Sequence, residues 1–365
     1  MRILRFSLAL PLSVTLAFAL ALPSAARNIQ ANNAYTVHNL VSDQPGVATF
    51  TDSNLKNGWG IAASGGSPWW VADNHTDKST LYRGDGSVQT RVVGVAGGPT
   101  GVIFNGTSDF TVTEGTHTGP AFFIFATEGG QILGWNPTVG LGTDAVLGGA
   151  HAGAIYKGLA IGVAGDAHNY LYAADFHTGP KGAIDVYNAS YALVTTLPGD
   201  FTDPGIPAGF APFNVQNIAG TLYVTYAMQD ADAEDEIAGP GLGYVSAFDT
   251  DGNFLGRVAS GGDLNAPWGL AWAPATGFGK FSGDLLVGNF GDGAINAFAA
   301  TSSGWEARGH LKTPNHHRLT IDGLWGIGFG NGNVTTGSGP TTTLYFAAGP
   351  NDEENGLFGS ITSAP

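Results

Sequence analysis

The sequence predicts an all-β fold: a six-bladed β-propeller built from four-stranded antiparallel blades. Three observations support this prediction. A phrase of short apolar segments occurs six times, at spacings of 41, 57, 56, 55 and 57 residues. The copies follow one another without a Pro/Ser-rich linker, and the last copy lacks a strand that the start of the chain supplies. Repeats that each hold four short strands are typical of propeller blades.

The first two segments of each copy read as strands. Short β-branched and aromatic runs that end at Gly or Asp are strand signals. The first segment has the copies Trp59–Ala62, Thr100–Ile103, Lys157–Ala160, Phe213–Gln216, Trp268–Ala271 and Trp325–Gly328. The second has the copies Trp70–Asp73, Phe123–Ala126, Leu171–Ala174, Leu222–Thr225, Leu285–Gly288 and Leu344–Ala347.

The third and fourth segments complete each predicted blade. The third opens with a glycine in all copies but the first, where Ser79 takes its place; the glycines are Gly130, Gly182, Gly243, Gly293 and Gly356. The fourth is weaker, and its clearest copies are Val88–Val95, Tyr191–Leu197, Phe254–Val258 and Trp305–Leu311. Alternating apolar residues in both segments favour strands with one buried face.

The two ends of the chain are predicted to meet in one sheet. The sixth copy ends at Ile361 after three strands, and an isolated strand, Tyr35–Leu40, precedes the first copy. We therefore expect Tyr35–Leu40 to be the outer strand of the last blade. This pairing would remove a free sheet edge and hold both termini in place.

Residues 1–26 are predicted to be a secretory signal peptide. Arg2 and Arg5 precede an apolar stretch, Phe6–Leu22, and small residues lead to a cleavage site after Ala26. We expect a secreted protein, extracellular or periplasmic, in which residues 27–365 form a single propeller domain. The chain has no cysteine, so its stability must come from packed sheets and tight turns.

The charge composition limits the partners. The chain has 14 Lys and Arg against 29 Asp and Glu, a formal net charge of −15. This balance argues against binding to nucleic acid or to an anionic membrane surface. Beyond the signal peptide, no stretch has the roughly 20 apolar residues of a membrane helix. We expect a monomer that binds a small molecule or a carbohydrate.

Polar residues gather where the second strand of each copy ends and where the first begins. In a propeller these positions surround one mouth of the central channel, where ligands bind. The segments after the second strands are Asp73–His75, Thr127–Glu128, Asp175–His177, Tyr226–Glu236, Asn289–Asp292 and Asn351–Glu354. The residues that lead into first strands are Asn57, Lys157, Asn214, Asn265 and Asp322.

A ring of carboxylate and amide oxygens suits a hard cation, and Ca²⁺ takes about six to eight such ligands. The alternative is that these side chains only shape turns by bonding to the backbone. The same two interpretations hold for the acidic run 230–236, which lacks the central glycine of an EF-hand loop. It is either a solvated loop or a site for a cation or a basic partner.

Histidines and tryptophans add candidates at the same mouth. His75 and His177 each stand two residues beyond a strand-ending aspartate, and an imidazole beside a carboxylate can act as a general base for water. They are the candidate catalytic residues, although loop histidines are commonly just solvated. The candidate ligand-binding residues, some of which could equally serve blade packing, are Asn57, Trp59, Lys157, Trp268, Asp292, Asp322 and Trp325.

The segments Leu264–Ala271, Leu285–Gly293 and Asp322–Gly326 resemble a family of exported six-bladed propeller proteins. The blades are similar to the superfamily of NHL-repeat proteins, the gluconolactonase and regucalcin group and secreted peptidyl-amidating lyases. The lactonase group holds one divalent ion with a glutamate, two asparagines and an aspartate. By blade position, the resemblance implies Asp73, Asp175, Asn214 and Asn289 as metal ligands, but no glutamate occupies the expected early position.

Three functions are compatible with these observations. The first is a propeller that binds a small ligand or a partner at the channel mouth, with Ca²⁺ as a possible cofactor. The second is a metal-dependent hydrolase of the lactonase type, and the third is a structural or adhesive surface protein. A serine hydrolase or a nucleotide-binding protein is disfavoured, because the nucleophile elbow and the phosphate-binding Gly-x-x-x-x-Gly-Lys sequence are both missing.

Overall fold

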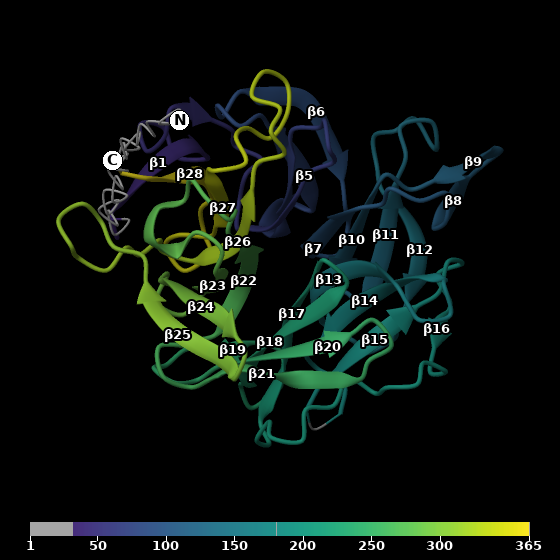
Figure 1. The fold of residues 1–365 in the computed structure, drawn as a ribbon. Coiled ribbons are helices and arrows are strands. Elements are labelled where there is room, and N and C mark those ends of the chain that lie inside the picture. The colour runs from purple at the N-terminus through teal and green to yellow at the C-terminus, as the bar shows by residue number, and fades with distance from the viewer. Residues whose placement is uncertain (1–31, 180, 365) are drawn as a thin grey trace, which may run out of the picture. The chain divides into compact units, whose positions relative to one another are not determined.

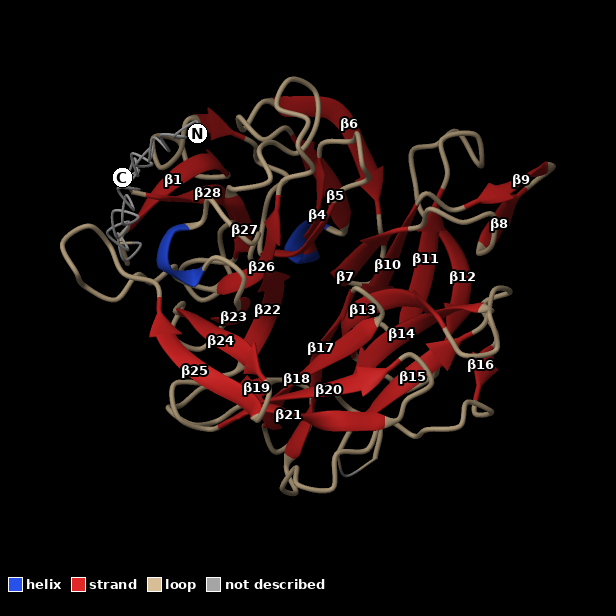
Figure 2. Cartoon of the chain, viewed as in Figure 1, coloured by secondary structure: helices blue, strands red, loops and turns tan. Residues whose placement is uncertain are grey.

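Six antiparallel sheets surround a common axis (Figure 1). The computed structural model describes residues 32–179 and 181–364, so the predicted signal peptide, residues 1–26, lies outside the described residues. Strands make up nearly all of the regular structure (Figure 2), with two short 3₁₀ turns, η1 (Asn74–Thr76) and η2 (Gly279–Phe281). None of the helices in the described part is long and apolar enough to span a membrane.

Five blades keep the chain order from the axis outward. Blade 1 is β3 (Gly58–Ala62), β4 (Trp69–Asp73), β5 (Lys78–Tyr82) and β6 (Val88–Gly94). Blade 2 is β7 (Pro99–Phe104), β10 (Phe123–Thr127), β11 (Gln131–Trp135) and β12 (Val146–Ala150). Blade 3 is β13 (Tyr156–Val163), β14 (Asn169–Asp175), β15 (Ala183–Tyr187) and β16 (Leu193–Val194).

Blades 4 and 5 follow the same plan. Blade 4 is β17 (Phe210–Ile218), β18 (Thr221–Gln229), β20 (Tyr244–Asp249) and β21 (Phe254–Ser260), with the short β19 (Glu236–Ile237) paired to β18. Blade 5 is β22 (Pro267–Trp272), β23 (Leu285–Asn289), β24 (Ile295–Thr301) and β25 (Gly304–His310). The innermost strands of neighbouring blades contact one another around the whole ring.

Blade 6 closes the ring with both ends of the chain. It contains β26 (Leu324–Phe329), β27 (Leu344–Ala348), β28 (Leu357–Ser363) and, outermost, β1 (Tyr35–Ser42). β1 runs antiparallel to β28, from Tyr35 opposite Ser363 to Ser42 opposite Leu357, and β2 (Phe50–Thr51) adds a short parallel pairing. The predicted propeller and its closure by the N-terminal strand are confirmed.

Two details differ from the strands expected from the sequence. Along the chain, a separate hairpin of β8 (Thr111–Glu114) and β9 (His117–Pro120) is inserted between β7 and β10, the first two strands of blade 2. The outer strand of blade 3 has only two residues, shorter than the predicted Tyr191–Leu197. Tyr191 is in the left-handed region (φ 59°), and its hydroxyl donates to the Phe110 carbonyl at 3.0 Å. Its ring is therefore used to pack blade 3 against blade 2.

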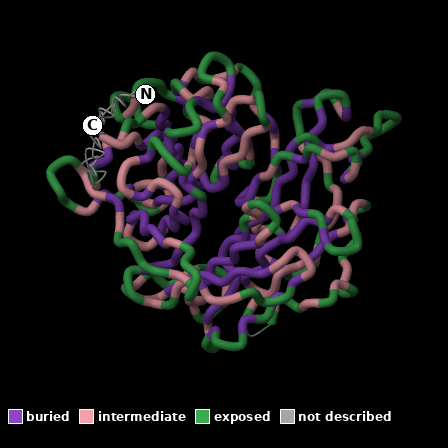
Figure 3. Tube along the Cα trace, viewed as in Figure 1, coloured by how far each residue is buried: buried purple, intermediate pink, exposed green. Residues whose placement is uncertain are grey.

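Close approach of the innermost strands explains the glycine of the first segment. A Cβ added at Gly60 would lie 2.6 Å from the Thr100 carbonyl, and one at Gly101 would lie 2.5 Å from the Leu159 nitrogen. Both are below any ordinary contact distance, so only glycine fits here. Blade 4 has Asn214 instead, whose amide donates to the Trp268 carbonyl of blade 5 at 2.8 Å. Burial follows the strands near the axis (Figure 3).

Candidate functional site

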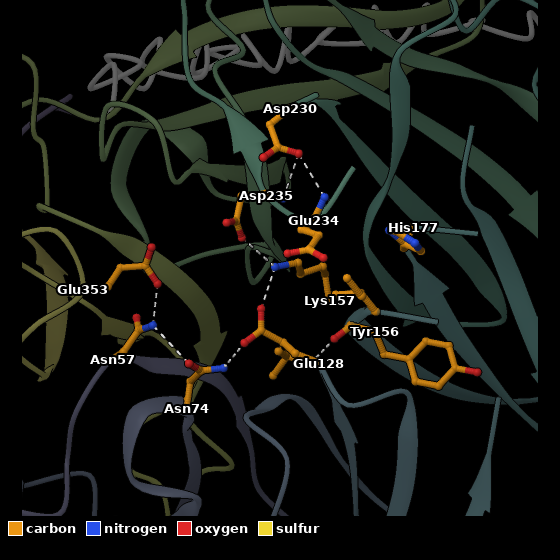
Figure 4. A network of polar contacts seen from close by, with 12 residues as sticks. Asn57, Asn74, Glu128, Tyr156, Lys157, His177, Asp230, Glu234, Asp235 and Glu353 are labelled. Atoms are coloured by element: carbon orange, nitrogen blue, oxygen red, sulfur yellow. Dashed lines mark hydrogen bonds and ion pairs between the residues drawn. The ribbon is translucent and has the colours of Figure 1, made fainter. Parts of the chain in front are cut away.

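Polar side chains from five blades converge at one end of the axis, which we call the top face. Here first strands begin and second strands end. The rim cluster consists of Asn57, Asn74, His75, Glu128, Lys157, Asp235, Glu236 and Glu353. Figure 4 shows most of its members, joined by a continuous chain of contacts. Blade 5 contributes none of these residues.

Lys157 is the centre of the rim cluster. It is only 1% exposed, because it lies in β13 beside the axis. Its Nζ donates to Glu128 Oε1 at 2.6 Å and to Asp235 Oδ1 at 3.3 Å, and it lies 5.3 Å from the centre of the Trp59 ring. A buried ammonium is costly unless it is paired. The ion pairs with these two carboxylates therefore stabilise Lys157 in its buried position.

Two asparagines connect this ion pair to blade 6. Asn74 Nδ2 donates to Glu128 Oε2 at 2.9 Å, and Asn57 Nδ2 is 3.5 Å from Asn74 Oδ1. Asn57 Nδ2 also donates to Glu353 Oε2 and is 3.4 Å from His75 Nε2. Because Asn57 is fully buried, its amide is fixed, and it holds the Glu353 carboxylate toward the axis.

Glu353 comes from a strained turn. Asn351, Asp352 and Glu353 are three successive residues with φ values of 58°, 51° and 66°. The left-handed conformation costs a non-glycine residue roughly 1–2 kcal/mol, and such strain is concentrated at functional sites. The turn is held by Asp322, whose Oδ2 accepts from the Asn351 nitrogen at 2.9 Å.

The acidic run 230–236 divides into residues with different roles. The Asp230 carboxylate accepts from the backbone nitrogens of Glu234 at 3.0 Å and Asp235 at 3.4 Å, which shapes the loop. Asp235 then reaches Lys157, and Glu236 begins β19, where its partner across the ladder is Gln229. Pairing of β19 with β18 thus places the half-buried Glu236 close enough to Lys157 for that ammonium to act on its pKa.

Burial and charge set the ionisation of the rim cluster. Burial raises the pKa of Glu236 to about 8, against the lowering effect of Lys157. Burial also raises the pKa of Glu353, although Asn57 opposes this shift. For Glu128, burial is outweighed by the Lys157 ammonium, so the pKa of that carboxyl is lowered. The pKa of Lys157 is raised, because its carboxylate partners outweigh its burial. Perturbed carboxyls beside a buried lysine are typical of functional sites.

Three tryptophans form the floor beneath the rim cluster. Trp59 and Trp325 stack with ring centroids 3.6 Å apart, and Trp268 meets both edge-on. Trp325 Nε1 donates to Asn57 Oδ1 at 3.0 Å, and Trp268 Nε1 donates to the Lys157 carbonyl at 2.9 Å. The tryptophans therefore support two residues of the rim cluster as well as filling the axis.

The four predicted metal ligands lie in four different blades. Asp73 is fully buried, and burial raises its pKa well above the ordinary value, with Thr80 of its own blade nearby. Asn214 uses both amide ends on the backbone, at Trp268 and Val215. Asn289 donates to Asp263 and Asp292, and Asp175 accepts from three backbone nitrogens. A metal shared by these four stays a prediction, and their observed contacts lie mostly within one blade or between neighbouring ones.

The remaining predicted residues divide between the rim and the turns. Asn57, Trp59, Lys157, Trp268 and Trp325 are in the rim cluster or its floor, and His75 lies beside Asn57. Asp292 lies in the turn that follows β23, and its carboxylate pairs with Arg318 at 3.3 Å. His177 stands apart from the contact chain in Figure 4, with Nδ1 3.2 Å from the Ala233 carbonyl. The catalytic role predicted for the two histidines stays a prediction.

The sequence placed Glu128, Glu236 and Glu353 in rim loops, but it did not select them as site residues. Glu128 is the one acid of its short turn, whereas Glu236 and Glu353 each stand among other acids, in residues 230–236 and 352–354, so the sequence does not tell which of these acids faces Lys157. A signal was present in Lys157, because a lysine at the start of an innermost strand needs carboxylate partners. Which carboxylates these are depends on the approach of blades 2 and 4, which no local pattern reveals.

The opposite end of the axis has a different character. There the ends of the innermost strands surround a cavity of about 520 Å³. Most of its lining residues are apolar, and polar groups such as Gln216 and Asn217 share the wall; the apolar ones include Ile61, Val102, Leu159, Leu270 and Ile327. The rim cluster and this cavity thus face opposite ends of the propeller.

Comparison with known proteins gives the family. No protein-family model matches the chain. The chain is 35% identical over 347 residues to the uncharacterized protein R648 of Acanthamoeba polyphaga mimivirus, an alignment that covers 91% of this chain and 81% of R648. The chain belongs to the R648 family. The uncharacterized protein L690 of the same virus is 33% identical over 343 residues, covering 90% of this chain and 85% of L690.

Solved structures agree on the fold of this R648-family chain. A streptogramin B lyase structure aligns with a TM-score of 0.50 and 12% sequence identity, over 90% of this chain and 98% of that one. At this identity the likeness shows the fold alone. It agrees with the propeller fold expected from the sequence.

Proposed function

We propose that the protein binds a small cationic ligand at the rim cluster. One observation carries this proposal: four carboxyl groups, from Glu128, Asp235, Glu236 and Glu353, gather around a single buried ammonium, that of Lys157. The cluster therefore holds more acidic than basic groups. Ca²⁺ is the simplest cation whose oxygen ligands match the carboxylates and amides present.

The aromatic floor stabilises the ammonium at the centre of the site. Trp59 and Trp325 lie directly beneath the polar groups, and the Lys157 ammonium is 5.3 Å from the Trp59 ring centre. Both rings are buried, and Trp325 is stacked on Trp59 and on Phe290. Tryptophan faces attract cations, so these rings stabilise the ammonium already present, and a second cation would be bound by the carboxylates. Asp235 and His75 are exposed, which leaves the cluster open to solvent.

Cation binding at this site is expected to strengthen as the pH rises. With a pKa of about 8, Glu236 is mostly protonated at neutral pH, and the pKa of Glu353 is also raised. A bound cation favours the ionised carboxylates, so binding releases protons. Affinity should therefore increase from about pH 6 to about pH 9, as Glu236 loses its proton.

Isothermal titration calorimetry of the full chain tests the proposal, with CaCl₂ and tetramethylammonium chloride as separate probes. Glu236→Gln and Glu353→Gln should each weaken binding by roughly tenfold or more, which is about 1.4 kcal/mol per lost charge contact. Glu306→Gln, on the exposed side of β25, is the matched control and should leave binding unchanged. The proposal is rejected if neither CaCl₂ nor tetramethylammonium binds. It is also rejected if Glu306→Gln loses as much affinity as Glu236→Gln and Glu353→Gln.

A second candidate function uses the cavity at the opposite end of the axis. Its volume of about 520 Å³ and its mainly apolar walls suit a small apolar molecule. Ile161→Trp should fill the cavity and abolish binding of a fluorescent apolar dye such as 1-anilinonaphthalene-8-sulfonate. Val163→Trp, on the same strand but outside the lining, is the control. Equal dye binding by wild type and Ile161→Trp would exclude this site.

The other functions expected from the sequence stay predictions. Metal-dependent hydrolysis would use His75 as a base at the rim cluster, and an adhesive role would need neither a metal nor a ligand. Secretion through residues 1–26 and a monomeric state also stay predictions. If His75→Ala leaves the hydrolysis of lactone and ester substrates unchanged, the hydrolase alternative fails for this site.

A further inference from the structure

A second group of polar side chains lies away from the axis, where blade 2 leads into blade 3. His151 follows β12, Asp175 ends β14 and Asp185 lies in β15. One potential ligand atom from each of these residues is within 4.8 Å of the others. Within residues 32–179 and 181–364, these are the only three or more His, Asp or Glu side chains gathered this closely.

Asp175 has an oxygen that no protein group satisfies. Its Oδ1 accepts from the backbone nitrogens of Ile155 at 3.2 Å, His177 at 3.0 Å and Thr178 at 3.2 Å. Its Oδ2 is buried and has no hydrogen-bond partner, and the residue as a whole is 0% exposed. Leaving a buried carboxylate oxygen unpaired is costly. A bound ligand that contacts this oxygen would remove that cost.

Asp185 and His151 complete the cluster from its more open side. His151 Nδ1 and the Tyr156 hydroxyl both lie 2.6 Å from Asp185 Oδ2, and Tyr156 is also 2.6 Å from the Tyr187 hydroxyl. Tyr156 therefore orients the carboxylate, as outer-sphere groups commonly do at metal sites.

The charges of this cluster are unbalanced. Among the described residues, neither Asp175 nor Asp185 forms an ion pair with a lysine or an arginine. The His151 side chain is 33% exposed, so an ion can reach the cluster from solvent. Two carboxylates and one imidazole thus share a small, mostly buried space that is accessible on one side.

Equivalent positions in other blades show that this composition is not required by the fold. By strand register, Asp175 and Asp185 correspond to Asp73 and Thr80 in blade 1. In blade 5 the same two positions are Asn289 and Asn296, whose amides donate to the Asp263 carbonyl. Only blade 3 combines two carboxylates with a histidine here.

We propose that His151, Asp175 and Asp185 bind a divalent first-row transition-metal ion such as Zn²⁺, with a fourth position open to water. One imidazole nitrogen and two carboxylate oxygens are a common ligand set for this ion class, whereas Ca²⁺ prefers oxygen ligands alone. The site is separate from the rim cluster and does not depend on the function proposed there.

Metal titration of the full chain, first treated with a chelator, tests the site. ZnCl₂ should bind in a 1:1 ratio and raise Tm by mass action, while CaCl₂ should have little effect on this site. His151→Ala and Asp185→Asn should each weaken Zn²⁺ binding by at least roughly tenfold. In wild type, Co²⁺ should give a visible absorption spectrum typical of an ion with nitrogen and oxygen ligands, and His151→Ala should lose it.

Two controls make the result decisive. Asp73→Asn changes the buried equivalent in blade 1, and His168→Ala removes a histidine that is 3.2 Å from Asp166 on the surface. Both should bind Zn²⁺ as wild type does. The proposal is overturned if wild type shows no 1:1 Zn²⁺ binding, or if the controls lose as much affinity as His151→Ala. Because His151 is partly exposed, His151→Ala should keep the fold, which far-ultraviolet circular dichroism verifies.

Discussion

Replacement of Lys157 by methionine tests whether the rim cluster depends on its buried ammonium. Methionine keeps the apolar stem beside Trp59 but removes the charge-assisted hydrogen bond to Glu128, whose length is 2.6 Å. Hydrogen bonds to charged groups contribute about 1.5–3 kcal/mol. The contact with Asp235 adds little, because that side chain is 75% exposed. We expect a loss of about 2 kcal/mol, less than for a fully buried pair, since Glu128 is itself partly exposed.

Differential scanning calorimetry measures this loss. An unfolding entropy of roughly 2.1 cal/mol/K per residue over residues 32–364 gives about 0.7 kcal/mol/K, so the expected fall in Tm is about 3 K. Lys56→Met is the matched control: Lys56 is 39% exposed, and its partner Asp43 has further donors in Gly356 and Asn355. We expect its Tm to change by about 1 K or less.

A double-mutant cycle separates the ion pair from other effects. Lys157→Met and Glu128→Gln should each destabilise the protein, and the double variant should cost clearly less than the sum, because both remove the same contact. A Tm loss for Lys157→Met no larger than that for Lys56→Met, together with additive effects in the cycle, would refute the reasoning.

Three further outcomes are expected from the structure. Tyr35→Ala should lower the unfolding free energy by about 3–5 kcal/mol, because this buried ring holds β1 in blade 6; Tyr35→Phe, which loses the bond that the hydroxyl donates to the Phe278 carbonyl and the one that it accepts from the Phe281 nitrogen, should cost about 1–2 kcal/mol. Trp325→Ala should cost about 3–5 kcal/mol by calorimetry and should also weaken cation binding, because its indole holds Asn57. The contribution of Glu236 to stability is present below its ordinary pKa of 4.5 and is lost as the pH rises through about 8. The Tm of wild type relative to Glu236→Gln should therefore fall over that range, and a constant difference would contradict the raised pKa.

Most of the fold could be predicted because each blade repeats a local pattern. Strand segments, turn glycines and the missing strand of the sixth copy are all visible as a period along the chain. The glycine after Trp59 or Trp268 recurs because a side chain there would strike the next blade. The outer strand of blade 3 was predicted too long, because the sequence does not distinguish a tyrosine that packs against the next blade, as Tyr191 does, from a tyrosine within a strand.

The candidate site could be predicted only in outline. Residue types and strand ends placed Asn57, Lys157 and three tryptophans near the channel mouth. The family resemblance implied one metal ligand in each of four blades, since several blades offer an equivalent polar position. Actual contacts depend on side-chain length and on neighbours in the next blade, so Asn214 is used in packing, whereas Asp175 meets His151 and Asp185.

The sequence by itself determined the number of blades, their order and the closure by the first strand, because these follow from short-range patterns and from one strand missing at one end and present at the other. Only the tertiary structure decided which acids surround Lys157 and which side chains gather at blade 3. Asn57 and Glu353 are 296 residues apart and meet only because the ring closes. Such contacts depend on the angle and spacing between blades, which a local pattern does not encode.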